Sequence, residues 1–415
     1  MALLIKNIKE LIGIDPNNRS WVRGAEMKQL NTLPNAYLII KDEIIAGFGS
    51  MKQLDLNEVN GNDLMQIDAA GKMVFPSFCD SHTHLVYAGS RELEYVDKIK
   101  GLSYEEIAKR GGGILNSAKR LHLTSEDELY ECAWQRLEEI KFLGTGAVEI
   151  KSGYGLTVED ELKMLRVIKR LNENSALTIR ATFLGAHAFP AEYKEHHDDY
   201  VDLILNEMIP LIAAEDLADF IDVFCDRGFF SIQQTEQILM AGMKHGMRAK
   251  IHANELAFSG GIQVGVKYDA LSVDHLEFTG DNEIASLLDS ETMPTLLPGA
   301  AFFLGMPYAP ARKMIDAGLG VALASDFNPG SSPSGNMQFI LSMGCIKYKM
   351  LPEEAINAVT LNSAYAMGVS DELGSIAVGK RANLFVTNPI PSYQYMPYYY
   401  GHNKVETVIL NGKIQ

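Results

Sequence analysis

Eight short apolar runs, most ending in polar residues, restrict the fold of this chain more than any other feature. Most are separated by stretches with the period of a helix, such as residues 158–172, 232–245 and 282–288. Eight strands that alternate with helices predict a (β/α)8 barrel in the α/β class. The runs are residues 73–80, 146–151, 178–184, 220–225, 248–252, 271–275, 292–297 and 320–326.

Both ends of the chain are rich in strand-like segments instead. Residues 37–40 and 43–49 flank Lys41-Asp42 and predict a hairpin. Near the C-terminus, residues 382–387 and 405–413 are strand-like, and Asn411-Gly412 is a turn signal. We therefore expect a small composite β-sandwich domain built from residues 1–72 and 376–415, with the barrel of residues 73–375 inserted between them. The length of 415 residues suits a large barrel with such an addition.

The charge balance and the cysteines limit the partners and the compartment. The net charge is −16, from 37 basic and 53 acidic residues, which argues against nucleic acid or an anionic membrane as a partner. The four cysteines are widely spaced, which fits a reducing compartment, and the N-terminus has no signal pattern. No apolar run approaches the ~20 residues that span a membrane. We expect a cytoplasmic protein.

The first run leads directly into a His-x-His pair. In an extended backbone, residues i and i+2 point to the same side, so His82 and His84 can direct two imidazoles at one point. Converging imidazoles suit a divalent metal such as zinc or iron. The alternative interpretation is two polar residues at the start of a loop.

Reactive residues recur at the ends of later runs. His252 ends the fifth run, His275 the sixth and Asp326 the eighth. Barrels of this class place their chemistry at the carboxyl ends of the strands, so we expect these residues to surround one mouth. Any one of them could simply cap a strand, but five such residues at matching ends are harder to obtain by chance. Four of them predict a metal site with a position open for water: His82, His84, His252 and Asp326.

The remaining polar residues supply a hydrolytic mechanism. A bound divalent ion lowers the pKa of water from about 15.7 to about 7, which provides hydroxide as a nucleophile. A carboxylate must then accept the proton. Glu255, three residues after His252, is the best candidate, although Asp326 could share the role. His275 is placed to polarise a carbonyl or stabilise the developing oxyanion.

These residues resemble the pattern of the amidohydrolase superfamily. The segments at residues 151–156 (Lys-Ser-Gly-Tyr-Gly-Leu), 185–187 (Gly-Ala-His), 252–255 (His-Ala-Asn-Glu) and 325–330 (Ser-Asp-Phe-Asn-Pro-Gly) are further similar to the imidazolonepropionase family, essentially over the whole chain. The resemblance implies metal-dependent hydrolysis of the cyclic amide C–N bond of 4-imidazolone-5-propanoate to N-formimidoyl-L-glutamate, in histidine degradation. It also implies one zinc or iron ion and a homodimer.

The resemblance also implies a set of substrate contacts. Arg91, seven residues past His84, can offer a bidentate fork to the propionate carboxylate. Its alternative is a surface ion pair with Glu92 or Glu94. The set that matches the family is Arg91, Tyr154, His187, Glu255, Asn328, Gly330 and Ser331. Tyr154 could instead plug a tight turn, and His187 could be a satisfied strand-end histidine.

The position of the lysines predicts how many ions are bound. Two-metal members of the superfamily bridge their ions with a carbamylated lysine on the fourth strand. The fourth run here, residues 220–225, contains no lysine, whereas Lys151 lies on the second. A single ion is therefore expected, provided that the strand count holds.

Two other function classes compete with this hypothesis. A deaminase of a nucleobase-like ring could use the same metal set and Glu255, but a neutral base gives Arg91 nothing to bind. A metal-free scaffold for protein assembly could lack part of the ligand set, and no gap is visible. Gly111-Gly112-Gly113 lacks the lysine and hydroxyl of a P-loop and is more typical of a loop that closes over a ligand. The tyrosines of residues 393–400 could pack on the barrel or form a subunit contact.

Overall fold

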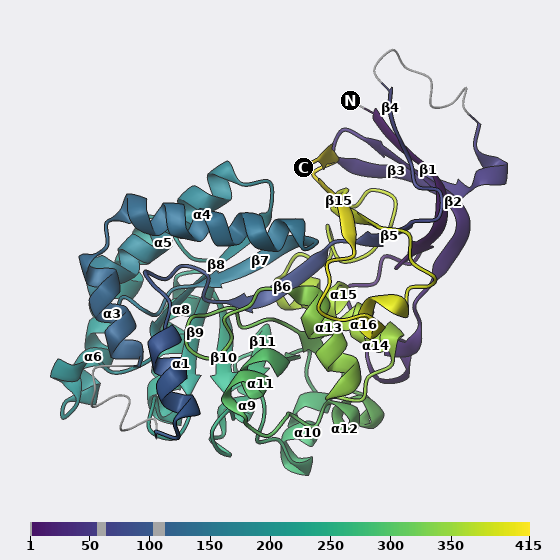
Figure 1. Ribbon diagram of the computed structural model, residues 1–415. Helices are drawn as coiled ribbons and strands as arrows, with labels where there is room; N and C mark the ends of the chain where they lie inside the picture. Colours follow the sequence, from purple (N-terminus) through teal and green to yellow (C-terminus); the bar gives the residue numbers. More distant parts are fainter. Residues whose placement is uncertain (1, 56–63, 103–112) are drawn as a thin grey trace.

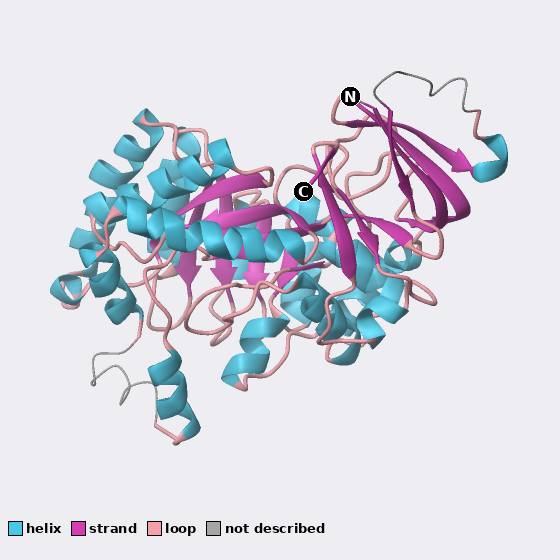
Figure 2. Cartoon of the chain, turned by 45° about the horizontal axis from the view of Figure 1, so that its top comes forward, coloured by secondary structure: helices cyan, strands magenta, loops and turns pink. Residues whose placement is uncertain are grey.

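The computed structural model describes residues 2–55, 64–102 and 113–415, and it has two parts (Figure 1). One is an eight-stranded parallel sheet surrounded by helices. The other is a separate sheet that contains both ends of the chain. Figure 2 shows the helices gathered around the parallel sheet, whereas strands dominate the terminal part. The predicted α/β class, with a barrel and a β domain from both termini, is confirmed.

The barrel strands follow one another in sequence order around the sheet. They are β6 (Phe78–Thr83), β7 (Thr145–Lys151), β8 (Thr178–Ala186), β9 (Phe220–Cys225), β10 (Arg248–Ala253), β11 (Ser272–His275), β12 (Met293–Leu296) and β13 (Ala322–Leu323). The residues after β13 return to β6, because Asp326 N donates to His82 O at 3.0 Å and His84 N donates to Phe327 O at 2.9 Å. These bonds bring the first and last strands together, so the sheet is a nearly closed barrel.

Helices fill the connections between the strands, and the three predicted ones are confirmed within two residues at each end. The best defined of them, α5, starts where the Thr157 side chain accepts a bond from Asp160 N. The helices of the barrel are α1 (Glu92–Ile99), α3 (Ile114–Leu123), α4 (Glu126–Phe142), α5 (Val158–Asn174), α6 (His197–Leu203), α7 (Ile209–Ala214), α8 (Ile232–Lys244), α9 (Gly261–Lys267), α10 (Asp281–Leu288), α11 (Pro298–Leu304) and α12 (Ala311–Ala317). After β13 come α13 (Met337–Ile346), α14 (Pro352–Val359) and α15 (Leu361–Ala366), and α16 (Tyr395–Tyr398) lies near the C-terminus.

The expected first barrel strand, residues 73–80, is two strands rather than one. Its first half, β5 (Met73–Pro76), pairs with β1 (Ala2–Ile12) and β14 (Leu384–Thr387) in the terminal sheet, and only β6 enters the barrel. Proline lacks the N–H that a continuous ladder requires, and Pro76 stands at this change of sheet. One apolar run therefore connects both parts.

The terminal sheet is continuous and curves back on itself. An isolated bridge joins Ile44 to Arg381, so the outer strand of the N-terminal hairpin reaches the C-terminal segment. One apolar cluster, which includes Leu38, Val74 and Leu384, draws on strands across the sheet. The predicted hairpin of residues 37–49 is present, and Asn411-Gly412 turns the chain between two further paired strands. The remaining strands are β2 (Thr32–Lys41), β3 (Ile44–Ser50), β4 (Leu64–Asp68), β15 (Val405–Leu410) and β16 (Lys413–Ile414).

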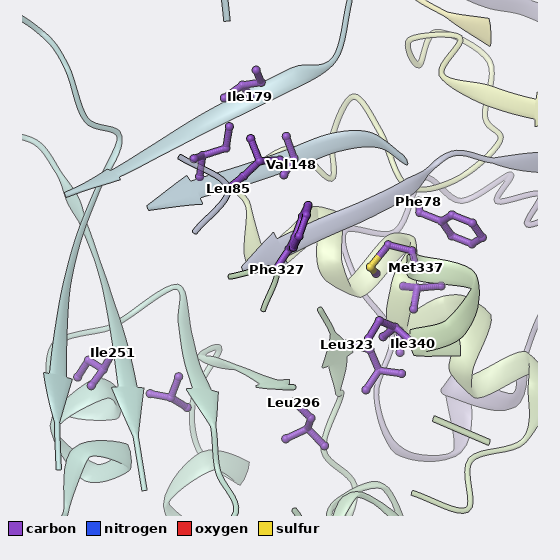
Figure 3. Packing of buried hydrophobic residues seen from close by; sticks show 14 of the residues in the cluster. Phe78, Leu85, Val148, Ile179, Ile251, Leu296, Leu323, Phe327, Met337 and Ile340 are labelled. Atoms are coloured by element: carbon purple, nitrogen blue, oxygen red, sulfur yellow. The ribbon is translucent and has the colours of Figure 1, made fainter. Parts of the chain in front are cut away.

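Alternate residues of the barrel strands face two different environments. Val148 on β7 and Ile251 on β10 belong to the apolar cluster between strands and helices (Figure 3). Their neighbours Glu149, Lys151 and Lys250 are fully buried but form ion pairs with other strand residues. Residues i and i+2 of a strand share a face, so these charged residues lie inside the barrel. Barrel interiors are usually filled by branched apolar residues, and a charged interior calls for a specific explanation.

In the described part of the chain, no helix is both long and apolar enough to cross a membrane.

Candidate metal centre and substrate pocket

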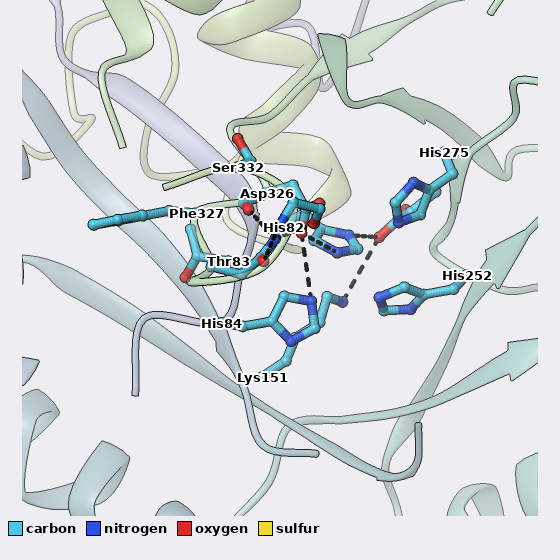
Figure 4. Close-up of polar contacts among 12 residues, drawn as sticks. His82, Thr83, His84, Lys151, His252, His275, Asp326, Phe327 and Ser332 are labelled. Carbon is cyan, nitrogen blue, oxygen red and sulfur yellow. Dashed lines mark hydrogen bonds and ion pairs between the residues drawn. The ribbon is translucent and has the colours of Figure 1, made fainter. Parts of the chain in front are cut away.

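The four predicted metal ligands meet at the carboxyl end of the barrel. One nitrogen from each of His82, His84 and His252 lies within 4.8 Å of the others. Asp326 Oδ1 lies 3.5 Å from His82 Nε2 and 3.5 Å from His84 Nε2. Figure 4 shows the three imidazoles and the carboxylate directed toward one another. Residues from β6, from β10 and from the segment after β13 thus form one site.

The chemistry of these donors fits a divalent metal ion. All four side chains are buried, and burial holds the pKa of His82 and of His84 well below the usual range, so both imidazoles are neutral, as ligands must be. Among the described residues, His82 Nε2 and His252 Nε2 have no hydrogen-bond partner. Buried polar atoms without partners are rare, and a bound ion would satisfy both. Three imidazoles and one carboxylate suit zinc or iron.

Asp326 is shaped by the loop that follows it. Its backbone has a φ of +53°, and its main-chain carbonyl accepts a 2.7 Å bond from Asn328 Nδ2. Ser331 Oγ donates to the carboxylate at 3.3 Å. Burial raises the pKa of Asp326 to about 7. A cation beside this carboxylate would stabilise its ionised form.

His275 and Glu255 lie side by side next to the metal ligands. His275 Nε2 is 3.6 Å from Glu255 Oε2. The His275 backbone has a φ of +82°, a strained conformation for a residue with a side chain, and such strain concentrates at functional sites. Burial, followed by the charges of Asp326 and Asp226, raises the pKa of Glu255 to about 8. A carboxylate with a raised pKa is suited to transferring protons near neutral pH.

A second carboxylate that sequence reasoning missed lies behind His275. Glu277 Oε2 is 3.9 Å from His275 Nδ1, and neither carboxyl oxygen of Glu277 has a hydrogen-bond partner in the described structure. Its burial, followed by the charge of Glu255, raises its pKa well above the usual range. The Asp-His-x-Glu spacing of residues 274–277 was the available signal, but it does not show which side of the histidine each acid occupies.

One cavity of about 460 Å³ joins the metal ligands to the predicted substrate contacts. Its size suits a small molecule. All seven predicted contacts line it: Arg91, Tyr154, His187, Glu255, Asn328, Gly330 and Ser331. Sequence reasoning missed one cation and five apolar residues of the lining: Lys98, Ile114, Phe224, Phe229, Leu256 and Leu304. Of the apolar ones, Ile114 and Leu304 lie at the ends of helices, and the others lie on a strand end or on loops. None has a chemical signature of its own.

The placement of Arg91 is compatible with both interpretations that sequence reasoning treated as alternatives. It lines the cavity, and its Nε and Nη2 donate to the same oxygen of Glu94 at 2.8 and 2.6 Å. Its Nη1 packs over Gly330, where an added Cβ would lie 2.3 Å from that nitrogen. Glu94 therefore holds the guanidinium on one side, and the missing side chain of Gly330 leaves room for it on the other.

The Tyr154 loop and His187 hold each other in place. His187 Nδ1 donates to Gly153 O at 3.0 Å, because burial lowers the pKa of His187 to about 3 and leaves the ring neutral. The ring stacks on His84, with centroids 5.1 Å apart. Gly153 has a φ of +106°, and a Cβ there would lie 2.9 Å from His187 Nδ1. His187 is thus a satisfied strand-end histidine that also contacts a predicted metal ligand.

Lys151 lies on β7, the second barrel strand, as predicted, and forms ion pairs with buried carboxylates. Its Nζ lies 2.5 Å from Glu149 Oε1 and 2.8 Å from Asp222 Oδ2. Burial would lower its pKa, but Asp222 and Glu149 reverse this and hold the pKa above the usual range. A lysine must be deprotonated to be carbamylated, and this one is held charged.

Some sequence features fall partly or wholly outside this site. Gly111 and Gly112 lie outside the described residues, whereas Gly113 N donates to Glu94 Oε2 at 3.0 Å. Across residues 2–55, 64–102 and 113–415, the only cluster of histidine, cysteine or acidic residues with metal-site geometry is that of His82, His84 and His252.

Comparison with known proteins gives the relatives of the chain. Residues 243–415 match the model of the amidohydrolase family. The imidazolonepropionase of Flavobacterium johnsoniae is 58% identical over 414 residues, and that of Christiangramia forsetii is 55% identical over 414 residues; both alignments cover 100% of each chain. An adenosine deaminase from Xanthomonas campestris, solved with bound zinc, has a TM-score of 0.72 at 16% identity, covering 99% of this chain and 92% of its own. This last likeness concerns the fold alone.

Proposed function

Since the chain belongs to the imidazolonepropionase family, we propose that it hydrolyses the ring amide of 4-imidazolone-5-propanoate to N-formimidoyl-L-glutamate, a step of histidine degradation. The observation that carries this proposal is one cavity lined both by metal-ligand residues and by Arg91. The substrate has a carboxylate and a cyclic amide, and the cavity offers a guanidinium for the first and hydrolytic residues for the second.

We propose that one divalent ion, zinc or iron, is held by His82, His84, His252 and Asp326. When bound, such an ion supplies Lewis acidity and makes a water molecule acidic enough to ionise near neutral pH. The ion pairs of Lys151 support a single ion, because that lysine is unavailable as a bridge between two.

The protein side chains divide the chemical steps among them. Glu255 accepts the proton of the attacking water and returns it to the departing ring nitrogen, because its raised pKa of about 8 allows both transfers. Asp326 can share the acceptance, because one of its carboxylate oxygens can stay free when the other holds the ion. His275 lies beside Glu255 and directs its ring at the carbonyl, where charge develops as the amide opens.

The other lining residues orient the substrate. Arg91 binds the propionate through a charge-assisted pair. Tyr154 and His187 form a wall next to His84, with the Tyr154 and His84 ring centroids 5.8 Å apart. Asn328, Gly330 and Ser331 form the opposite loop, which Asn328 braces by accepting bonds from Gly330 N and Ser331 N at 2.8 Å each. These contacts hold the ring against the catalytic residues.

The proposal is tested with protein purified without chelators. Ultraviolet loss of freshly prepared 4-imidazolone-5-propanoate should require the metal and should be abolished in His252→Ala. In Arg91→Ala, KM should rise about 10–100-fold, because a charge-assisted hydrogen bond contributes about 1.5–3 kcal/mol. The protein should be inactive on cytosine and guanine. Ammonia release from either base at a comparable rate would favour a deaminase instead and contradict the proposal.

We further propose the cytoplasm as its compartment and a homodimer as its assembly, with no nucleic acid or membrane as a partner. The family resemblance, the widely spaced cysteines and the net charge of −16 support these assignments. Light scattering of the eluting protein should give twice the chain mass of 45.8 kDa. We also propose residues 1–72 with 376–415, and residues 73–375, as the two folding domains, with β5 at the start of the second range pairing in the sheet of the first.

A further inference from the structure

A group of five charged side chains fills the barrel directly beneath the metal site. We name it the buried ionic cluster: Glu149 and Lys151 on β7, Asp222 on β9, Lys250 on β10 and Asp274 on β11. All five side chains are 0% exposed. Buried ion pairs seldom increase stability by themselves, because desolvation costs about as much as the pairing gains. Five charges in a barrel interior therefore point to a role other than stability.

Two members of the buried ionic cluster contact the metal-ligand histidines from behind. Asp274 Oδ2 lies 2.6 Å from His82 Nδ1, and Asp222 Oδ2 lies 3.0 Å from His252 Nδ1. Asp222 Oδ1 also accepts a 3.1 Å bond from His252 N. A carboxylate behind a ligand histidine fixes the orientation of the ring and leaves Nε2 for the ion.

Lys151 connects these two carboxylates. Its Nζ lies 2.8 Å from Asp222 Oδ2 and 3.7 Å from Asp274 Oδ2, the same two oxygens that face the histidines. Glu149, at 2.5 Å, holds the ammonium group from a third side. A displacement of Nζ would therefore alter the supports of His82 and His252 together.

We propose that Lys151 is a positioning residue for the metal centre, which acts through Asp222 and Asp274 to set the orientation of His252 and His82. This inference rests on the metal centre of the proposed function, but it concerns ion binding and is independent of which substrate the enzyme takes. It assigns the ion pairs of Lys151 with Asp222 and Asp274 to preorganisation of the ligands.

Lys250 provides a matched control within the same cluster. It is as buried as Lys151 and also forms an ion pair with Glu149. Its other bonds go to main-chain carbonyls, to Ser81 O at 3.1 Å and to Ala366 O at 3.2 Å. In the described structure it forms no ion pair with Asp222 or Asp274. Loss of Lys250 therefore removes a buried cation but keeps the contacts of Lys151 with Asp222 and Asp274.

The test measures the binding of Co²⁺ alone to the metal-depleted full-length protein, by competition with a chromophoric chelator. Lys151→Met should raise the dissociation constant about 10–100-fold, the range for partners of metal ligands. It should also shift the visible absorption bands of bound Co²⁺, which report ligand geometry. Lys250→Met should change neither the dissociation constant nor the bands. Circular dichroism spectra of the metal-free proteins control for folding.

A double-substitution cycle separates positioning from general damage and remains available if Lys151→Met folds poorly. Asp222→Asn keeps the shape of the side chain and should weaken Co²⁺ binding by itself. If Lys151 acts through Asp222, adding Lys151→Gln to Asp222→Asn should cost less than Lys151→Gln costs alone. Additive losses, or equal losses in Lys151→Met and Lys250→Met, would overturn the proposal. Failure of the wild-type protein to bind Co²⁺ would instead contradict the proposed metal centre itself.

Discussion

At the scale of single residues, the carboxylate subsite depends on a glycine as much as on an arginine. A Cβ at residue 330 would lie 2.3 Å from Arg91 Nη1, so Gly330→Ala must displace the guanidinium. We expect KM to rise several-fold toward that of Arg91→Ala, with a smaller change in kcat. Gly47→Ala is a control, because a Cβ there meets nothing within 4 Å. Steady-state kinetics in which Gly330→Ala behaves like the wild type would show that Arg91 does not bind the substrate from this position.

We expect the acid limb of the pH profile to follow the ionisation of Glu255. Burial and the charge of Asp326 raise its pKa to about 8 in the metal-free protein. A bound cation offsets the charge of Asp326, so the pKa should fall below about 8 in the loaded enzyme. A base works only when it is deprotonated, and kcat should therefore rise with pH through this value and then level off. The limb should disappear in Glu255→Gln, and a limb unchanged by this substitution would assign it to another group.

The convergence of the proposed metal ligands could be predicted from the sequence, but the groups that contact them from behind could not. His252 and Asp326 end apolar runs, His82 follows one, and a barrel brings the ends of its strands to one mouth. Lys250 precedes His252 by two residues, and Asp274 precedes His275 by one. Their roles depend on which side chains face them from other strands, and a pattern along one strand cannot show this. Glu94 and Lys98 were similarly indistinguishable from the other charges of α1.

At the scale of elements, β15 joins the terminal sheet to the barrel. Val405, Val408 and Leu410 belong to the same apolar cluster as Phe78 and Phe385, whose ring centroids lie 4.9 Å apart. Each buried aliphatic side chain contributes about 1.5–3 kcal/mol. Deletion of residues 405–415 should therefore remove most of the stability of the protein and strongly reduce its soluble yield.

A shorter deletion provides the control for this prediction. Residues 414 and 415 are exposed, with Ile414 at 42% of its full accessible area. A chain that ends at Lys413 should melt within a few degrees of the full-length protein by differential scanning calorimetry. If the chain that ends at Lys404 were as stable as the full-length protein, β15 would not contribute to the stability of the barrel.

The division of the first apolar run into two strands could not be predicted from the sequence. Residues 73–80 have the composition of one buried strand, and nothing in their hydrophobic pattern marks a change of sheet. The pairing partners decide it: β5 fits between β1 and β14, whereas β6 lies beside β7. The strands after it have helices on both sides in the sequence, so their order in the barrel followed directly from the alternation of elements.

At the scale of the whole molecule, binding of the ion and folding are coupled. Any ligand that binds only the folded state stabilises it, by about 4 kcal/mol at a thousandfold excess over the dissociation constant. Removal of the metal by dialysis against a chelator should lower Tm, and added Zn²⁺ should restore it. Tm of His252→Ala should respond to neither treatment. A wild-type Tm that does not depend on the chelator would show that the site holds no ion.

We propose that residues from distant parts of the chain hold one divalent ion in the cavity that receives the substrate. Anomalous diffraction from crystals of protein purified without chelators, recorded at the zinc and iron edges, tests it most directly. We predict one peak, about 2.0–2.2 Å from donor atoms of His82, His84, His252 and Asp326. Two peaks in the cavity, or a peak that these four residues do not share, would contradict the account.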